Sequence, residues 1–258
     1  MSWRTPHSVR RPRVMLGTPH GGLGRTYGAR TRAYRDPVTR EEVQAHHVRI
    51  RGLRPDTDYL YMAVHDGATP EPGTFRTAPR GRRPLTFTSF GDQSTPQVNK
   101  PMPTDRITLW TQDNYGSRFA GDTTTAVEPI APLFHLMNGD LCYAQLSGNP
   151  TRVWRDWFIN NSRSMRNRPW MPAAGNHENE AGNGPIGYHA FQTYFDVPRN
   201  GCDDRVNPYG FCSFDVDPGR RGGRTTMRVT YHAVTGPGGA TRPVDTFVLE
   251  RPRSDDRR

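Results

Sequence analysis

Residues 133–143, LFHLMNGDLCY, decide the fold, because their apolar run predicts a buried strand that stops at Gly139-Asp140. An apolar run bounded by a glycine is typical of a strand in a parallel sheet. Open α/β sheets bind their ligands at the carboxyl ends of such strands. The carboxylate of Asp140 is therefore a candidate site residue.

The same arrangement occurs twice more in the chain. Residues 85–90, LTFTSF, are followed by Gly91-Asp92, and residues 170–174, WMPAA, are followed by Gly175-Asn176-His177-Glu178. Three strand ends that each deliver oxygen or imidazole groups favour a metal site. The candidate ligands and the candidate catalytic residue are Asp92, Asp140, Tyr143, Asn176 and His177.

These residues resemble the purple acid phosphatases of the metallophosphoesterase superfamily, whose pattern runs G-D-x-G, G-D-x-x-Y and G-N-H-[ED]. The block at 139–143 matches the second element fully and the block at 175–178 matches the third. The block at 91–94 matches the first, except that Ser94 replaces the glycine. A single Gly-Asp pair has no value as evidence, whereas the three blocks in this order are a specific signal.

The resemblance implies a dinuclear metal centre of iron with zinc, manganese or a second iron. It implies that Asp92 and Tyr143 bind one metal, that Asp140 bridges both and that Asn176 binds the second. His177 then faces the phosphate of a phosphate ester substrate. A bridging carboxylate holds two cations roughly 3.5–4 Å apart, so that both act on one phosphate. A phenolate suits a ferric ion, and a neutral amide suits a divalent partner.

The predicted fold class is a two-domain mixture of α+β and α/β. Residues 1–79 have an all-β pattern and resemble a fibronectin type III-like sandwich, in which residues 53–59 precede a tyrosine corner. Residues 80–84 form a basic linker rich in proline and glycine. Residues 85–200 resemble the first half of an αββα metallophosphoesterase sandwich, and residues 201–258 resemble C-terminal strands with a basic tail.

The resemblance is interrupted after residue 200. The family pattern continues with βα units that end in V-x-x-H and G-H-x-H and supply three histidines, and we do not find these units. A deletion or a faulty gene model is the preferred explanation. The gap leaves an apolar sheet face uncovered and two cations short of ligands, so the activity of this chain is in question.

Other functions stay open at this point. The chain is either an acid phosphatase, a metallophosphodiesterase with the same metal core, or an inactive remnant that acts as a binding module. Its net charge of +10 also suits a nucleic-acid binder. Its basic residues are scattered arginines, with Lys100 as the only lysine, so we expect no specific nucleic-acid partner.

The sequence says less about the cellular location of the protein and about the state of its cysteines. No apolar run approaches the roughly 18 residues of a membrane span, and the first residues show no signal-peptide pattern. An extracellular or cell-surface location is implied by the family alone. We expect Cys142 to be structural, while Cys202 and Cys212 either pair or stay free. We expect His135 to be a hydrogen-bonded core residue.

Overall fold

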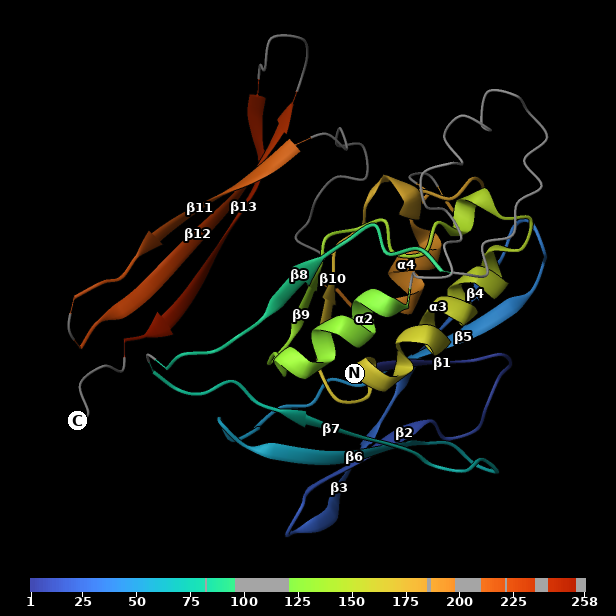
Figure 1. Cartoon of the computed structure of the whole chain (residues 1–258), viewed down its shortest axis with the longest axis horizontal. Coiled ribbons are helices and arrows are strands. Elements are labelled where there is room, and N and C mark those ends of the chain that lie inside the picture. The colour runs from blue at the N-terminus through green and yellow to red at the C-terminus, as the bar shows by residue number, and fades with distance from the viewer. Residues whose placement is uncertain are drawn as a thin grey trace. The chain divides into compact units, whose positions relative to one another are not determined.

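The computed structural model describes residues 1–81, 83–95, 121–184, 187–197, 210–220, 222–234 and 241–253 (Figure 1). The chain divides into two compact units. The first consists of Met1–Ala78 and Leu85–Val197, and the second of Pro79–Pro84 and Pro198–Arg258. Among the described residues, strands contribute more residues than helices in both units. None of the described helices is long and apolar enough to cross a membrane.

The elements follow one another along the chain in this order. The first unit contains β1 (Ser2–Thr5), β2 (Arg13–Thr18), β3 (Gly22–Gly28), β4 (Arg30–Arg35), β5 (Glu42–His47), β6 (Asp58–Val64), β7 (Glu71–Arg76), β8 (Thr88–Phe90), α2 (Asp122–Val127), η2 (Glu128–Ile130), β9 (His135–Met137), η3 (Ala144–Leu146), α3 (Pro150–Met165), β10 (Trp170–Pro172), η4 (Asn176–Glu178) and α4 (His189–Tyr194). The second unit contains β11 (Gly210–Asp217), β12 (Arg224–Val234) and β13 (Thr241–Pro252).

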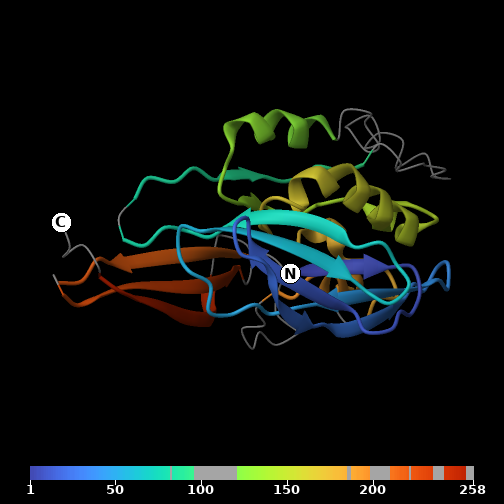
Figure 2. The ribbon, with the colours of Figure 1, turned by 90° about the horizontal axis from the view of Figure 1, so that it is seen from below.

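The N-terminal strands form two antiparallel sheets, with the orders β1-β5-β4 and β3-β2-β6-β7. Figure 2 shows these strands from below, in blue to cyan. In β2, the side chains of Val14 and Leu16 are fully buried and alternate with less buried positions, as one face of a sheet requires. The hydroxyl of Tyr59 accepts a hydrogen bond from the backbone N–H of Arg54 at 2.8 Å. This is the contact of a tyrosine corner. The predicted β-rich, sandwich-type N-terminal segment is confirmed.

The three motif-bearing strands form one parallel sheet, in the order β10-β9-β8, and lie side by side (Figure 1). His135 of β9 lies opposite Thr88 of β8 and Trp170 of β10. Helix α3 lies in the connection between β9 and β10, so that the chain crosses back over the sheet through a helix. The finer prediction, an incomplete αββα sandwich, stays a prediction.

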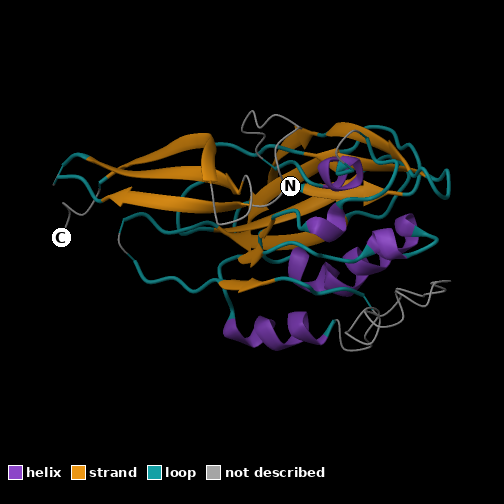
Figure 3. Cartoon of the chain, turned by 90° about the horizontal axis from the view of Figure 1, so that it is seen from above, coloured by secondary structure: helices purple, strands orange, loops and turns teal. Residues whose placement is uncertain are grey.

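Helix α3 begins with two local signals and buries an aromatic stripe. The side chain of Asn149 accepts a hydrogen bond from the N–H of Arg152, and Pro150 occupies the first turn, where no N–H is needed. Trp154 and Trp157, three residues apart, are almost completely buried. Figure 3 shows the helices in purple and the strands in orange.

A single core connects the N-terminal strands with the parallel sheet and its helices. Tyr34 of β4 and Val43 and Ala45 of β5 belong to the same buried cluster as Met137 of β9 and Trp154 of α3. The N-terminal sheet β1-β5-β4 therefore supports the elements that carry the motif residues. The predicted domain boundaries at residues 79 and 84 stay predictions. Residues 1–78 and residues 85–197, which lie on either side of these boundaries, belong to the same compact unit.

The second unit is an antiparallel sheet in the order β11-β12-β13. Phe214, Val229 and Phe247 lie directly opposite one another and share a face, because paired residues of neighbouring strands point to the same side. Val229 in the central strand is buried, whereas Phe214 in the outer strand is exposed. The predicted alternatives for Cys202 and Cys212 lie outside what the structure describes.

Candidate metal centre

The strand order brings the predicted ligands to one edge of the parallel sheet. Asp92 follows β8, Asp140 follows β9, and Asn176 opens η4 after β10. The N–H of Asp92 donates to the carbonyl of Gly139 at 3.2 Å, and the N–H of Asn138 donates to the carbonyl of Phe90 at 2.9 Å. The loops that carry the two aspartates are therefore in direct contact. Their role as metal ligands stays a prediction.

Three of the four predicted ligands have a left-handed backbone. The φ angles are 51° at Asp92, 50° at Asp140 and 60° at Tyr143. Residues with a side chain rarely adopt this region, and such strain is concentrated at functional sites. The backbone turns sharply at each of these positions, so that the side chains leave the strand direction at the sheet edge.

The side chains form a chain of contacts around this edge. The hydroxyl of Tyr143 donates to Oδ1 of Asp92 at 2.8 Å, and the Tyr143 ring lies 4.3 Å from the His177 ring, measured between centroids. The backbone N–H of His177 donates to Oδ1 of Asp140 at 2.9 Å. The side-chain amide of Gln145 contacts Nδ1 of His177. Four of the five predicted site residues are thus linked, while Asn176 is exposed at the start of η4.

Two glycines allow the loops after β9 and β10 to approach each other closely. A Cβ atom on Gly175 would lie 2.1 Å from Oδ1 of Asp140, and a Cβ atom on Gly139 would lie 2.6 Å from the Cα of Gly175. Gly139 also has φ 89°. The glycine in each motif block is therefore needed because the β9 and β10 loops pack backbone against backbone.

Sequence reasoning assigned no role to Glu178, although it is the last letter of the third motif block. Its side chain is fully buried, and its carboxylate accepts hydrogen bonds from three backbone N–H groups. Burial raises the pKa of this carboxyl, and the three backbone hydrogen bonds counteract that increase. The position of Glu178 in the motif was the only signal that could have identified it.

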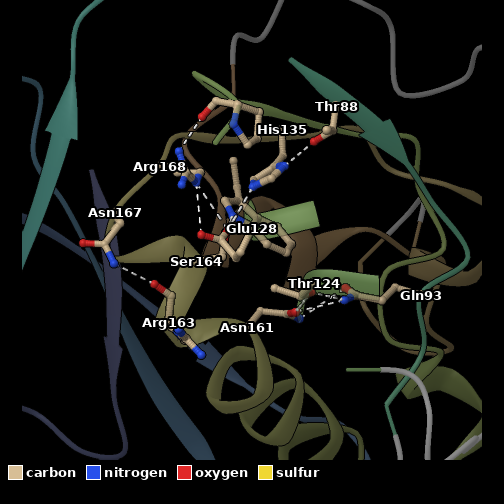
Figure 4. Close-up of polar contacts among 12 residues, drawn as sticks. Thr88, Gln93, Thr124, Glu128, His135, Asn161, Arg163, Ser164, Asn167 and Arg168 are labelled. Atoms are coloured by element: carbon tan, nitrogen blue, oxygen red, sulfur yellow. Dashed lines mark hydrogen bonds and ion pairs between the residues drawn. The ribbon is translucent and has the colours of Figure 1, made fainter. Parts of the chain in front are cut away.

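Gln93, the neighbour of Asp92, is anchored on helix α3. Its side-chain amide donates to Thr124 at 2.7 Å and to Asn161 at 2.9 Å (Figure 4). The indole of Trp157 donates to its carbonyl oxygen at 2.9 Å. All of these groups are buried. The loop that bears Asp92 is therefore attached to the helix core.

His135 is buried at the start of β9 and hydrogen bonds with Thr88 and with Ser164, the latter at 3.0 Å (Figure 4). Its Nε2 lies 3.5 Å from the Glu128 carboxylate, which in turn pairs with Arg168. Burial lowers the pKa of His135. As expected, His135 is a hydrogen-bonded core residue.

Cys142 is also buried, and burial raises the pKa of its thiol, which keeps it protonated. This environment agrees with the structural role expected for it.

The family histidines have no counterpart in the described residues. The letters V-x-x-H do occur at positions 43–46 and 229–232, but both lie within antiparallel strands, β5 and β12. His46 hydrogen bonds with Thr5 at 2.9 Å, and His232 hydrogen bonds with Ser213 at 2.9 Å. G-H-x-H does not occur anywhere in the sequence. Neither histidine follows a parallel strand, as the histidines of the family pattern do.

The donors present suit a hard cation. Asp92, Asp140 and Tyr143 offer carboxylate and phenol oxygens, which hard cations prefer. Among the described residues, however, no group of three or more histidine, cysteine, aspartate or glutamate side chains is placed to hold a metal ion. The side chains therefore fit one cation better than two, because a second cation would depend on Asp140 and Asn176.

Fold and site together define a protein in which an N-terminal β domain precedes an α/β segment with an oxygen-rich site at its strand ends. Residues 1–77 match the family described as the purple acid phosphatase N-terminal domain. The predicted resemblance to the purple acid phosphatases is confirmed, and residues 1–77 are similar to the N-terminal domain of that family.

Three curated relatives match most of the chain. Two uncharacterized proteins of Mycobacterium tuberculosis are 61% identical over 206 residues, which is 80% of this chain and 38% of each relative. A protein named probable purple acid phosphatase 20 of Arabidopsis thaliana is 26% identical over 180 residues, which is 70% of this chain and 36% of the relative. The chain thus spans less than two fifths of these relatives. A solved structure titled "Structure of PhoD" aligns with a TM-score of 0.37 and 12% identity, over 76% of this chain and 46% of that one.

Proposed function

We propose that this chain carries the first half of the site of a metal-dependent phosphoric ester hydrolase of the acid phosphatase type. The observation that carries the proposal is the contact between Tyr143 and Asp92 at the ends of two different strands, next to the Asp140 loop. The match of residues 1–77 supports the same family. The proposal includes a fibronectin type III-like fold for the N-terminal sheets and the extracellular or cell-surface location that the family implies.

In this proposal, Asp92 and Tyr143 hold one cation, Asp140 is shared, and Asn176 contributes to a second. Bound iron with zinc, manganese or iron would supply Lewis acidity and a nucleophile from water at neutral pH. The Tyr143 hydroxyl donates a hydrogen bond to Asp92, so a cation that binds the phenolate oxygen has to displace the hydroxyl proton. Metal affinity should therefore rise with pH.

His177 is the proposed catalytic residue. Because the Gln145 amide contacts its Nδ1, a donated hydrogen bond there places the proton of the neutral ring on Nε2. Nε2–H can then donate a hydrogen bond to a phosphate oxygen or to the leaving-group oxygen. The Tyr143 ring against the imidazole restricts its orientation.

The test uses the purified 258-residue chain, supplied with iron and then with zinc or manganese. Metal stoichiometry, visible absorbance and hydrolysis of an aryl phosphate are measured. We expect one tightly held cation, a visible charge-transfer band that Tyr143→Phe abolishes, and turnover far below the ordinary range of about 1–10³ s⁻¹. The matched control is Asp58→Asn, because Asp58 is an exposed carboxylate that pairs with Arg76 in the N-terminal sheets.

Two outcomes would contradict the proposal in different ways. A folded chain that binds no cation at all would end the metal-site assignment. Two cations per chain with ordinary turnover would show that other residues complete the site, and the argument from missing histidines would be wrong.

A second candidate function is a binding module without catalysis. It is favoured by one observation, namely that the described residues contain no metal-type cluster of histidine, cysteine and acidic side chains. Metal content separates the two functions, because a binding module needs no metal and should be unchanged by chelators.

A further inference from the structure

We propose that Glu178 is a positioning residue that holds the loops after β9 and β10 in one fixed geometry. The link to metal binding rests on the proposed function, whereas the clamp between the loops does not. The clamp joins the loop that carries Asp140 to the loop that carries Asn176.

Both carboxylate oxygens of Glu178 accept hydrogen bonds from backbone N–H groups. Oε1 of Glu178 accepts from the N–H of Leu141 at 2.7 Å. Oε2 accepts from the N–H of Asp140 at 2.8 Å and from the N–H of Gly175 at 2.7 Å. One carboxylate thus bridges two segments that are more than thirty residues apart in the sequence.

The backbone at Asp140 explains why it can receive a carboxylate. Gly139 and Asp140 have φ angles of 89° and 50°, so the consecutive N–H groups of Asp140 and Leu141 point to the same side. Converging N–H groups of this kind form a concave anion-binding nest. Glu178 is the internal anion of this nest. This accounts for a fully buried glutamate that, in the part of the chain that the structure describes, has no arginine or lysine among its hydrogen-bond donors.

The contact is reciprocal. While Glu178 accepts from the backbone of Asp140, the side chain of Asp140 accepts from the backbone of His177 at 2.9 Å. Each of the two carboxylates therefore accepts a hydrogen bond from the backbone of the loop that carries the other. The left-handed turn at Asp140, which sets the direction of its side chain, depends on the Glu178 carboxylate.

The first experiment measures amide hydrogen exchange in the metal-free chain, for the wild type and for Glu178→Gln. Glutamine has the same shape, but its NH₂ group faces backbone donors that need an acceptor. We expect the amides of Asp140, Leu141 and Gly175 to exchange at least about tenfold faster, while β2 and β6 are unchanged.

The matched control is Glu180→Gln. Glu180 is also a buried glutamate of the same segment, but its carboxylate accepts from the side chains of Trp154 and Asn183, each at 2.6 Å. Neither of these two hydrogen bonds involves a backbone N–H of the loops that carry Asp140 and Asn176. We expect this variant to leave the exchange of the three amides near the wild-type rate.

The second experiment measures the affinity for zinc or ferric iron. Loss of a group that orients metal ligands typically lowers metal affinity by 10–100-fold, and we expect this range for Glu178→Gln and less than about threefold for Glu180→Gln. Glu178→Asp, which keeps the charge but shortens the reach, should give intermediate values. It also serves as the test variant if Glu178→Gln does not fold.

The two parts of the inference fail separately. Wild-type exchange rates at the three amides in folded Glu178→Gln, or in Glu178→Asp, would overturn the clamp whether or not metal binds. A wild-type chain that binds no metal would refute the proposed function, and the exchange experiment would still decide the role of Glu178.

Discussion

Among single residues, position 94 is where this chain departs from its family pattern, with serine in place of glycine. The structure shows what the departure means, because Ser94 is buried and has φ 62°. Glycine adopts this region without steric cost, whereas a side chain brings its Cβ close to the backbone. The glycine of the motif is therefore a conformational requirement that this chain meets under strain.

We expect Ser94→Gly to be more stable than Ser94→Ala by about 1 kcal/mol, because alanine keeps the strained Cβ while both lose the hydroxyl. Chemical denaturation of the two variants measures the difference in the free energy of unfolding. Comparing the two variants removes any contribution of the serine hydroxyl. Equal stability would show that the backbone relaxes out of the left-handed region.

Glu180 makes stability depend on pH. Burial, together with the nearby Asp36 and Glu178, raises its pKa to about 7, although hydrogen bonds from Trp154 and Asn183 act in the opposite direction. The folded state therefore prefers the protonated acid. The contribution of this group is most favourable below its unfolded pKa of about 4.5 and is lost as the pH rises through about 7.

Between pH 4 and pH 8, we expect the wild type to lose about 3 kcal/mol of stability relative to Glu180→Gln, since each pKa unit corresponds to about 1.4 kcal/mol. Urea denaturation of both proteins at several pH values gives this difference. Any change in the free energy of unfolding that the substitution causes at all pH values cancels, because only the change with pH is compared. Parallel curves would contradict the raised pKa.

Among the elements, the strand-end loops of β9 and β10 are the most constrained. The carboxyl ends of parallel strands bring them together, and Gly139 and Gly175 let their backbones touch. The Asp140 side chain occupies the space that a Cβ atom at position 175 would need. Loop geometry and ligand direction are therefore set by the same contact.

We expect Gly175→Ala to cost about 2–3 kcal/mol of stability and to weaken metal binding, because the added methyl group displaces Asp140. The control is Gly24→Ala in β3, where an added Cβ meets no atom within 4 Å, and it should stay within about 0.5 kcal/mol. Thermal unfolding and metal titration check both. Wild-type behaviour of Gly175→Ala would show that the two loops are further apart than described.

The end of helix α3 shows a second contact between elements. The carbonyl of Arg166 accepts from the N–H of Thr74 in β7 at 2.9 Å and from the hydroxyl of Tyr61 in β6 at 3.1 Å. A helix C-terminus leaves carbonyls without partners inside the helix. Here the N-terminal sheet supplies them, which ties that sheet to the helix behind the candidate site.

For the whole molecule, the shared core has a consequence for unfolding. Because Tyr34, Val43 and Ala45 are buried with residues of α3 and β9, strands β4 and β5 cannot unfold without exposing that core. Contiguous cores unfold cooperatively, whereas separate domains show separate transitions. The first unit should therefore unfold in one step.

We expect Val43→Ala in β5 to destabilise the first unit by about 1–3 kcal/mol and to accelerate amide exchange in α3 as much as in β5. The control is Val38→Ala, whose side chain is 57% exposed and which should have almost no effect. Hydrogen exchange resolved by segment makes the measurement. An effect confined to the N-terminal strands would show that they form an independent domain.

The sequence by itself determined the local features of this protein. The pattern of residues 1–79 predicted a β-rich N-terminal segment, and apolar runs predicted the strands around positions 88, 135 and 170, because side-chain periodicity follows directly from strand geometry. The motif letters identified Asp92, Asp140, Tyr143, Asn176 and His177 as site candidates. Ordered Gly-Asp and Gly-Asn blocks carry that information without reference to distant residues.

Only the tertiary structure decided how distant segments depend on one another. The clamp of Glu178 binds backbone N–H groups, which every residue but proline possesses, so no sequence pattern could point to its partners. The burial of Tyr34 against α3 and α4 likewise depends on which faces meet in space. Strand and ligand types are encoded locally, whereas the support of the site comes from long-range packing, which exists only once the chain has folded.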